Sequence, residues 1–401
     1  MNRFFYPDQS ATSQMVSDLA SYLSTQGIEV AAVSSRQLYE NASAALPARE
    51  VTSGVRVFRV WTTTNGRTHL IGRALDYATF CVGAYCRLYC LLRKQDLVVA
   101  KTDPPLLSAI AAAVVTAKGA RLVNWSQDVF PEVAQASGVG IAVGVPGRML
   151  RALRNWSWRR ASRNVAVGQR MAAYMKDQGV PTHRVSVIHN WADGGLIRPL
   201  AQETNALRKE WGLEDVFVVG YSGNLGRAHE ASTMVCAIEI LSVEPGIRFL
   251  FIGGGKSYQD LRELVTQRRL QNVIFKPYQP RECLAMSLSV PDVHLISLRS
   301  EMEGFVVPSK FYGVAAAGRP IVFIGDSDGE ISRLVLELRC GRTVAEGDGQ
   351  ALAASIRELR DDKSLLLQLG KNARNAFDLK FDKAIALSKW ERLLEQVAQE
   401  G

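Results

Sequence analysis

The sequence lacks most of the patterns that assign a chain quickly to a class of protein. Its six cysteines form no Cys-x-x-Cys pair and have no histidine nearby, so free thiols in a reducing cytoplasm explain them better than metal binding or redox chemistry. The five histidines are scattered without the spacing of a zinc site. We therefore expect neither a bound metal nor another cofactor.

Motifs of several enzyme classes are missing as well. No strand-like run leads directly into Gly-x-Gly-x-x-Gly, the phosphate turn of nicotinamide and flavin oxidoreductases. The segment FLFIGGGKSYQDL looks like a P-loop, but Leu250 stands where that motif requires its first glycine. A serine hydrolase would need a Gly-x-Ser-x-Gly elbow, which the sequence does not have. These gaps argue against all three classes.

Long apolar runs are also absent. The two most apolar stretches, residues 79–92 and 106–115, are interrupted by Arg87 or fall short of the about 18–20 residues that cross a bilayer. No secretory signal precedes them. We expect a cytoplasmic protein that does not span the membrane.

Acidic residues are missing from one long basic segment. Residues 141–170 contain seven arginines and no aspartate or glutamate, and the whole chain has a net charge of +9. Trp156 and Trp158 lie within this segment, which has the character of a helix. Such a helix suits an anionic membrane surface, so we expect the arginines from Arg148 to Arg163 to hold the protein on the inner face of the cytoplasmic membrane. A solvated helix face and a nucleic-acid surface are the alternatives, and we predict no nucleic-acid partner.

What the sequence does contain is a regular alternation of strand-like and helical segments. A length of 401 residues favours two domains, and the alternation favours parallel sheets covered by helices. We expect an α/β fold of two facing, doubly wound domains with a ligand cleft between them. The predicted parts are an N-terminal domain over 1–189, a join over 190–203, a C-terminal domain over 204–380 and a helix over 381–401 that packs back towards the first domain.

The beginning of the chain departs from this plan. Only Met1, Asn2 and Arg3 precede the loop FFYPDQSATSQ, where a doubly wound domain normally opens with an apolar strand. The first strand is therefore truncated or nearly absent, or the natural start lies upstream. We expect the second.

Two segments of the C-terminal half combine glycine with positive charge. In EGFVVPSKFYGVAAAGRP, Pro308 and Ser309 predict the start of a helix and Gly318 its end, which places Lys310 in the first turn against the helix dipole. A cation in that position indicates a shared anion, although a surface lysine is the alternative. In VVGYSGNLGRAHE, a strand leads into a Gly-x-x-Gly turn with Arg227 at a predicted helix start, which suits a phosphate or a plain tight turn.

Seven motifs in a fixed order resemble those of a known family. They are YPDQSATSQ, NWSQDVFPEV, VIHNWADGGLIRPL, YSGNLG, FIGGG, NVIFKPYQP and EGFVVPSKFYGVAAAGRP. This series looks like that of the family 4 glycosyltransferases with the GT-B fold, in the branch that makes bacterial exopolysaccharides and capsules of the colanic-acid type. The resemblance covers essentially the whole chain. It implies two Rossmann-like domains and a retaining, metal-independent transfer of a sugar from a nucleotide-diphosphate-sugar to a polyprenyl-diphosphate-linked saccharide, in exopolysaccharide, capsule or O-antigen synthesis.

The resemblance also implies a donor site in the C-terminal half. Lys310, Arg227 and Glu303 take catalytic roles. Glu301 also precedes the acid-Gly-Phe turn and is the residue most easily confused with Glu303. The implied donor-binding residues are Gly223, Asn224, Gly226, Gly304, Phe305, Val306, Ser309 and Tyr278. The Tyr278 ring either stacks on the nucleobase or packs within the protein.

In the N-terminal half, the resemblance implies an acceptor and phosphate loop made by Ser10, Thr12 and Gln127. Asp128 either orients and helps to deprotonate the acceptor hydroxyl or caps the turn before Pro131. Many relatives carry a second glutamate that binds ribose, and Gly313 stands in its place here. Two alternatives stay open. A nucleotide-sugar 2-epimerase shares the two-domain plan, and a catalytically inactive transferase-like partner is kept open by this departure and by the near-absent first strand.

Overall fold

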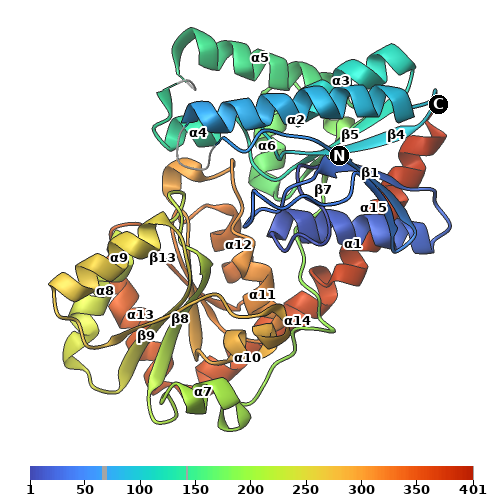
Figure 1. Ribbon diagram of the computed structural model, residues 1–401. Helices are drawn as coiled ribbons and strands as arrows, with labels where there is room; N and C mark the ends of the chain where they lie inside the picture. Colours follow the sequence, from blue (N-terminus) through green and yellow to red (C-terminus); the bar gives the residue numbers. More distant parts are fainter. Residues whose placement is uncertain (66–69, 141–142, 401) are drawn as a thin grey trace. The chain divides into compact units, whose positions relative to one another are not determined.

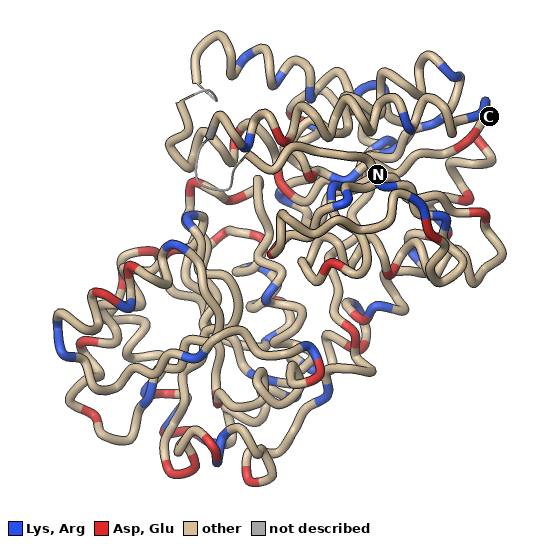
Figure 2. Tube along the Cα trace, viewed as in Figure 1, with Lys and Arg blue, Asp and Glu red and all other residues tan. Residues whose placement is uncertain are grey.

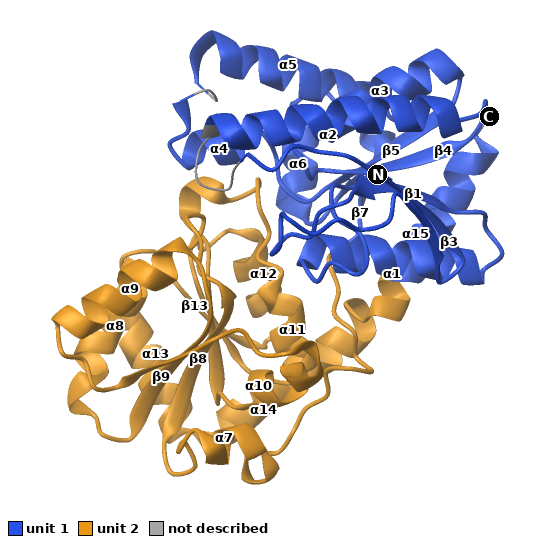
Figure 3. Cartoon of the chain, viewed as in Figure 1, with its two compact units in different colours: residues 1–189, 387–401 blue, residues 190–386 orange. Residues whose placement is uncertain are grey.

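The computed structural model describes residues 1–65, 70–140 and 143–400 and divides the chain into two compact units (Figure 1 and Figure 3). Unit 1 comprises residues 1–189 and 387–401, and unit 2 comprises residues 190–386. The boundary near the C-terminus falls within helix α15 (Lys383–Gln399). Each unit is built from parallel strands and helices, so the predicted α/β class is correct.

Unit 2 contains one six-stranded parallel sheet in the order β10-β9-β8-β11-β12-β13. Its strands are β8 (Phe217–Asn224), β9 (Ile247–Gly254), β10 (Val273–Lys276), β11 (Val293–Ser297), β12 (Ile321–Ile324) and β13 (Gly341–Val344). The first strand in chain order, β8, therefore lies in the middle, and the order reverses between β8 and β11. Ligands of doubly wound sheets bind at the carboxyl ends of the strands that flank such a reversal.

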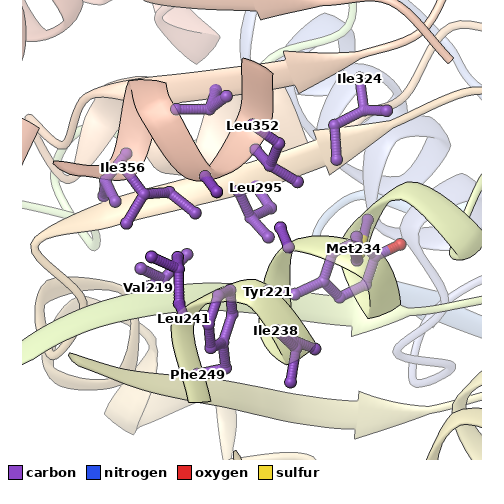
Figure 4. Close-up of a cluster of buried hydrophobic side chains, with 14 of the residues drawn as sticks. Val219, Tyr221, Met234, Ile238, Leu241, Phe249, Leu295, Ile324, Leu352 and Ile356 are labelled. Carbon is purple, nitrogen blue, oxygen red and sulfur yellow. The ribbon is translucent and has the colours of Figure 1, made fainter. Parts of the chain in front are cut away.

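Helices lie on both sides of this sheet (Figure 1). They are α7 (Ala206–Glu210), α8 (Ser232–Ile240), α9 (Lys256–Gln267), α10 (Leu284–Ser289), α11 (Lys310–Ala316), α12 (Glu330–Glu337), α13 (Gly349–Asp361) and α14 (Lys363–Lys380). Val219, Phe249 and Leu295 of the sheet pack with Met234 of α8 and Ile356 of α13 in a buried core (Figure 4). The central strands are mostly apolar and buried, as expected for a parallel sheet whose two faces are both covered by helices.

Unit 1 contains two groups of strands. One has the order β1-β3-β2 and the other the order β4-β5-β6-β7. The strands are β1 (Ala31–Ser35), β2 (Arg49–Thr52), β3 (Val55–Val60), β4 (Leu97–Lys101), β5 (Arg121–Ser126), β6 (Arg163–Ala166) and β7 (Val185–Val187). The helices are α1 (Ala11–Thr25), α2 (Leu70–Leu91), α3 (Leu107–Lys118), α4 (Glu132–Ala136), α5 (Gly144–Arg160) and α6 (Gln169–Asp177). Among the described residues, no helix is long and apolar enough to cross a membrane.

The first three residues join the two groups of strands. The Met1 carbonyl accepts a hydrogen bond from the Lys101 amide at 3.1 Å, and the Arg3 amide donates to the Asp103 carbonyl at 2.8 Å, both on the side of β4. On the side of β1, the Arg3 carbonyl accepts from the Ser35 amide at 2.8 Å. Residues 1–3 thus occupy the place of a central strand, and the strand order of unit 1 reverses at this segment.

One strand was not expected from the sequence. β2 runs antiparallel to β3, and Ser53 and Gly54 connect the two strands with positive φ angles of 48° and 75°. The side chains of β2 alternate between exposed and half-buried, and none is fully buried. The strand therefore lacks the apolar pattern that predicts a buried strand from sequence.

The last helix belongs largely to unit 1 through its aromatic contact with β5. The rings of Trp390 (α15) and Trp125 (β5) lie 4.6 Å apart between centroids, and both side chains are fully buried. Tyr22 of α1 donates a hydrogen bond to the Glu391 carboxylate at 2.7 Å. A Trp–Trp contact of this kind buries a large apolar area at one position.

We expect Trp390→Ala to lower the free energy of unfolding of unit 1 by about 3–5 kcal/mol, because it leaves a cavity under Trp125. Gln396→Ala, at an exposed position of the same helix, should change it by less than about 0.5 kcal/mol. Urea unfolding followed by circular dichroism measures both values. Equal stability of the two variants would show that α15 does not hold unit 1 together.

Candidate functional site

The carboxyl end of β8 brings Gly223 next to Lys310. Gly223 has φ +112°, a conformation that favours glycine, and a Cβ atom added there would lie 3.1 Å from the Lys310 Cε atom. Lys310 opens α11, which is capped by Ser309 and Ala317 and so agrees closely with the predicted helix. Two segments about ninety positions apart in the sequence therefore meet where the strand order reverses.

His229 holds the Lys310 amine. The His229 Nδ1 atom lies 2.7 Å from the Ser297 carbonyl oxygen, which can only accept, so Nδ1 carries the proton and donates. The Nε2 atom is then an acceptor, and the Lys310 Nζ atom donates to it at 3.1 Å. Nζ also lies 5.3 Å from the centroid of the Tyr221 ring, within the range of a cation–π contact.

Burial shifts the pKa values of both partners downwards. Loss of solvent lowers the pKa of Lys310 from 10.5 to about 7. Burial and then the neighbouring Lys310 charge lower the pKa of His229 to about 3, against a smaller opposing effect of its hydrogen bond to Ser297. The imidazole is therefore neutral at physiological pH, and the Lys310 amine titrates close to physiological pH.

The loop after β8 differs from the prediction at Arg227. This arginine is exposed and does not begin a helix, because α8 starts at Ser232. The Glu230 carboxylate accepts hydrogen bonds from the Ser232 and Thr233 amides at 2.6 and 3.1 Å and so fixes the later start. The prediction of paired helix amino-ends at residues 227 and 310 is therefore wrong for Arg227.

The remaining residues of this loop form a tight turn. The Leu225 amide donates to the Gly254 carbonyl at 2.8 Å, and the Gly226 carbonyl accepts from the His229 amide at 3.0 Å. Asn224 is exposed, and its side chain lies beside Gly226 and Gly255, as the short distances to Cβ atoms placed there indicate. The turn is thus tied to β9 on one side and to His229 on the other.

The predicted acid-Gly-Phe turn precedes α11. Glu303 is extended, Gly304 has φ +79°, and the Phe305 amide donates back to the Met302 carbonyl at 3.0 Å. The Glu303 Oε1 atom accepts from the amides of Gly304 at 3.2 Å and of Glu330 at 2.9 Å, so the carboxylate lies at the amino end of α12.

The other residues expected around this turn differ in exposure. Val306 is half-buried and Ser309 is exposed. Glu301, the alternative to Glu303, is exposed and forms an ion pair with Arg299. Tyr278 is 54% exposed, and a Cβ atom placed on Gly254 would lie 3.2 Å from its ring. The tyrosine ring therefore lies over the glycine-rich end of β9.

In unit 1, a buried lysine lies at the carboxyl end of β4. Lys101 is 1% exposed, its Nζ atom donates to the Thr12 carbonyl at 3.0 Å, and the same atom lies 4.0 Å from the centroid of the Trp125 ring. Asp128 follows β5, the strand paired with β4, and the Gln127 amide donates to the Thr102 hydroxyl at 3.2 Å. The loops after β4 and β5 are therefore held together.

Three ionisable groups in this part of unit 1 have shifted pKa values. Loss of solvent lowers the pKa of Lys101 to about 7, against the opposing charges of Asp103, Asp128 and Asp18. Asp128 has an exposed side chain, yet the surrounding protein excludes enough water to raise its pKa to about 6 against the charge of Lys101. Loss of solvent also raises the pKa of Asp103 to about 6, against the charges of Arg3 and Lys101.

The polar groups of Ser10 contact Asp8. Its amide donates to the Asp8 Oδ1 atom at 2.9 Å, and its hydroxyl donates to the same atom. Thr12 lies in the first turn of α1 and uses its carbonyl for Lys101. Asp8 thus accepts from both polar groups of Ser10, and a phosphate-binding role for them stays a prediction.

The basic segment forms α5, but only part of it matches the prediction. Trp158 is 3% exposed, with the Arg154 guanidinium 3.9 Å from its ring centroid, and Arg154 forms a buried ion pair with Glu132. Arg163 lies in β6 and pairs with Glu400. These residues do not belong to an exposed basic face, because Arg154 and Trp158 lie on the side of α5 opposite to Trp156.

Two models of protein families match the chain. The glycosyl transferase 4-like domain matches residues 10–191, and the glycosyl transferases group 1 domain matches residues 203–376. The chain is a family 4 glycosyltransferase. Enzymes of this family transfer sugars from nucleotide-sugar donors with retention and do not require a metal.

Individual relatives agree with this assignment. The transferase is 28% identical over 311 residues to the probable glycosyltransferase WbjE of Pseudomonas aeruginosa, covering 77% of this chain and 76% of WbjE. Its fold is similar to that of sucrose-phosphate synthase from Thermosynechococcus elongatus, with TM-score 0.75, 18% identity and coverage of 99% and 95%. HepE of Anabaena, solved in complex with UDP-glucose, has TM-score 0.71 and 16% identity over 99% of this chain and all of HepE. The predicted GT-B fold is thus confirmed.

Sequence reasoning missed two residues of the transferase. His229 was one of five scattered histidines, and its only signal was its position in the loop after a predicted strand, two residues beyond Arg227. Lys101 was overlooked as the last residue of an apolar strand, DLVVAK. A lone charged residue at the carboxyl end of a buried strand is a usable signal, since parallel sheets bind ligands at that edge.

We expect Gly223→Ala to weaken binding of nucleoside diphosphates at least about tenfold, because the new methyl group strains a backbone with positive φ and displaces Lys310. Gly246→Ala is the matched control, because Gly246 directly precedes β9 and lies outside the loop after β8. A Cβ atom added there would meet nothing within 4 Å, and its φ is not positive. Isothermal titration calorimetry measures both affinities, and equal affinities would remove Gly223 from the donor site.

Proposed function

We propose that this transferase moves a sugar from a UDP-sugar to a polyprenyl-diphosphate-linked saccharide at the cytoplasmic membrane, in the synthesis of an O-antigen, exopolysaccharide or capsule of the colanic-acid type. The observation that carries the proposal is the Lys310 amine beside the Gly223 turn, at the point of strand reversal in unit 2. An anion bound there meets an ammonium group and a turn without side-chain bulk.

The chemistry follows from the charge that develops during transfer. The leaving diphosphate becomes more negative as the glycosidic bond breaks, so a cation placed in advance stabilises the transition state more than the bound donor. Lys310 supplies this charge from a partly desolvated position at the start of α11, and the exposed Arg227 in the loop after β8 supplies a second. The departing phosphate oxygen takes the proton of the acceptor hydroxyl, and Glu303 contacts the donor sugar.

The acceptor half of the reaction is assigned to unit 1. The Asp128 carboxylate follows β5 at the ligand-binding edge and has its pKa raised to about 6, which keeps it mostly ionised at pH 7 while making it a better hydrogen-bond acceptor than an ordinary aspartate. We assign to it the orientation of the acceptor hydroxyl. Gln127, beside it, lines the same loop.

The choice of donor and pathway is supported by the relatives. HepE was solved with UDP-glucose, and WbjE is a probable glycosyltransferase that shares about three quarters of its length with this chain. Tyr278, over the end of β9, provides a ring for stacking on the nucleobase. Gly313 leaves the ribose without the glutamate of many relatives, so we assign ribose binding to the backbone of the turn that begins at Glu303.

Lys310→Ala should lower the rate of sugar transfer by about two orders of magnitude or more, the scale expected for removing a charge partner of the transition state. The donor is first identified by the rise in melting temperature with UDP-, GDP- and ADP-sugars. Lys371→Ala, at an exposed position of α14, is the control and should keep full activity. Undiminished transfer by Lys310→Ala would refute the assignment, and conversion of the donor without any acceptor would indicate an epimerase.

An exposed apolar stripe on α5 supports the membrane part of the proposal (Figure 2 marks the arginines of this helix in blue). Four large apolar side chains are exposed on α5 at intervals of four, four and three residues: Val145, Met149, Leu153 and Trp156. At these intervals they lie on one side of the helix, and the exposed Arg148, Arg159 and Arg160 border them. Apolar insertion between flanking arginines is the pattern of a helix that lies in an anionic bilayer surface.

A second apolar stripe lies on α2, and α3 packs between α2 and α5 (Figure 1). Five exposed side chains follow one side of α2 at intervals of four, seven, three and four residues: Ile71, Leu75, Val82, Tyr85 and Tyr89. The Lys118 Nζ atom of α3 lies 4.0 Å from the Tyr89 ring centroid. Tyrosine next to lysine suits the headgroup region of a membrane.

Arg159→Glu with Arg160→Glu should weaken binding to vesicles that contain phosphatidylglycerol at least about tenfold, since each basic residue near such a surface contributes about 1 kcal/mol. Arg262→Glu with Lys371→Glu changes the net charge equally at two exposed positions of unit 2 and should leave binding nearly intact. Vesicle flotation measures both. Equal losses in the two double variants would mean that net charge, not α5, attracts the protein.

A further inference from the structure

We propose that His229 is a positioning residue for Lys310, and that the donor diphosphate binds with uptake of a proton from solvent by the Lys310 amine. The proposal rests on the proposed function of the same site and adds to it how the lysine is held and in which protonation state the donor meets it. It is carried by the hydrogen bonds of the imidazole with Ser297 and Lys310.

The imidazole is fixed from both sides of the strand reversal. The Nδ1 atom of the ring donates to the Ser297 carbonyl at the end of β11, and the backbone amide of His229 donates to the Gly226 carbonyl in the loop after β8. The Ala228 carbonyl accepts from the Arg299 amide at 2.9 Å, which ties the same loop to the segment after β11. The ring therefore presents Nε2 in one orientation.

Only neutral groups contact the Lys310 amine in the part of the chain that the structure describes. Nε2 of His229 accepts from it at 3.1 Å, and the Tyr221 ring lies 5.3 Å away. The Tyr221 hydroxyl donates to the Asn224 carbonyl at 3.2 Å and keeps its proton, since burial raises its pKa well above 10. Among the described residues, no carboxylate forms an ion pair with Lys310. Arg227, in the loop after β8, lies near Lys256 of α9.

These contacts hold the amine in place without fixing its charge. A carboxylate partner would keep the ammonium protonated and would compete with the donor for it. A neutral imidazole orients the amine and leaves its positive charge for an incoming anion. Since burial lowers the pKa of Lys310 to about 7, part of the free enzyme carries a neutral amine at physiological pH. A bound diphosphate favours the ammonium, so binding draws a proton from solvent to Nζ.

The sign of the pH dependence follows. Below about pH 7 the ammonium is already present in the free enzyme, and affinity should change little with pH. Above about pH 7 each bound diphosphate must bring a proton with it, so affinity should fall towards tenfold per pH unit.

The test uses UDP as the probe with the full chain and two variants. Calorimetric titrations between about pH 6 and 9, in buffers of different ionisation enthalpy, give both the affinity and the number of protons taken up. His229→Phe removes the acceptor, so the fall in affinity should begin below pH 7, and binding at neutral pH should weaken about tenfold. His229→Gln offers an amide oxygen as acceptor and should restore most of the wild-type behaviour.

A second measurement does not depend on the donor. Brief acetylation with acetic anhydride at a series of pH values, read by mass spectrometry, reports the protonation of Lys310 in the free enzyme, with the exposed Lys371 as the reference amine. The midpoint for Lys310 should lie near pH 7 in the wild type and lower in His229→Phe. A structural role of His229 alone would lower the melting temperature without moving this midpoint.

The outcomes separate the two proposals. A folded His229→Phe variant with wild-type affinity and an unmoved midpoint overturns the positioning role. A wild type that binds UDP with equal affinity at all these pH values, and without proton uptake, overturns the coupling. A wild type that binds no nucleoside diphosphate overturns the donor site and the coupling together, while the acetylation midpoints still decide the role of His229.

Discussion

The order of the strands in each unit determines where a functional side chain of this transferase can lie. All strands of the unit 2 sheet are parallel, so their carboxyl ends share one edge, and the connections on either side of the reversal between β8 and β11 leave in opposite directions. Gly223 lies at the carboxyl end of β8 and Ser297 ends β11, and the segment after Ser297 returns Lys310 to the same place. The place of the proposed donor site thus follows from the topology of the sheet before it follows from chemistry.

The same constraint places a lysine in unit 1. Lys101 ends β4, next to the segment of residues 1–3 where the strand order reverses, and lies against the Trp125 ring. Each unit therefore has a desolvated lysine where its strand order reverses, and each of these two lysines lies within cation–π distance of an aromatic ring, Trp125 or Tyr221. The lysines differ in their acidic neighbours, because Asp103 and Asp128 oppose the downward shift at Lys101 while no carboxylate does so at Lys310. The nearby carboxylates thus favour a charged Lys101 held within the protein, whereas the Lys310 amine has no described carboxylate neighbour and is available to a ligand.

The sequence predicted the parts of the fold that depend on local patterns. Apolar runs in the sequence mark most strands of the two units but not β2. Pro308 and Gly318 predict the ends of α11 within about two residues, because proline and glycine restrict or relax the backbone at their own positions. The start of α8 could not be predicted in this way. It depends on the Glu230 side chain, which accepts from the Ser232 and Thr233 amides and keeps Arg227 outside the helix.

The sequence also could not predict which side chains of the basic segment are buried. Composition showed arginines and tryptophans together, but Arg154 and Trp158 turn inwards because Glu132, from the preceding helix, supplies the charge that Arg154 needs when buried. The tautomer of His229 likewise follows from a carbonyl 68 positions away. Pairings of this kind require the three-dimensional fold.

Retention of configuration limits what a carboxylate in unit 1 has to do. In a retaining transfer the acceptor hydroxyl approaches the sugar on the same face as the leaving diphosphate, so the departing phosphate oxygen is the nearest base. In the proposed mechanism, Asp128 then has only to orient the hydroxyl through a hydrogen bond, for which a carboxylate with a pKa of about 6 is mostly ionised at pH 7. The same proposal passes the proton to a phosphate whose growing charge Lys310 neutralises. The proposed roles thus assign orientation of the acceptor to a residue of unit 1 and stabilisation of the leaving group to a residue of unit 2.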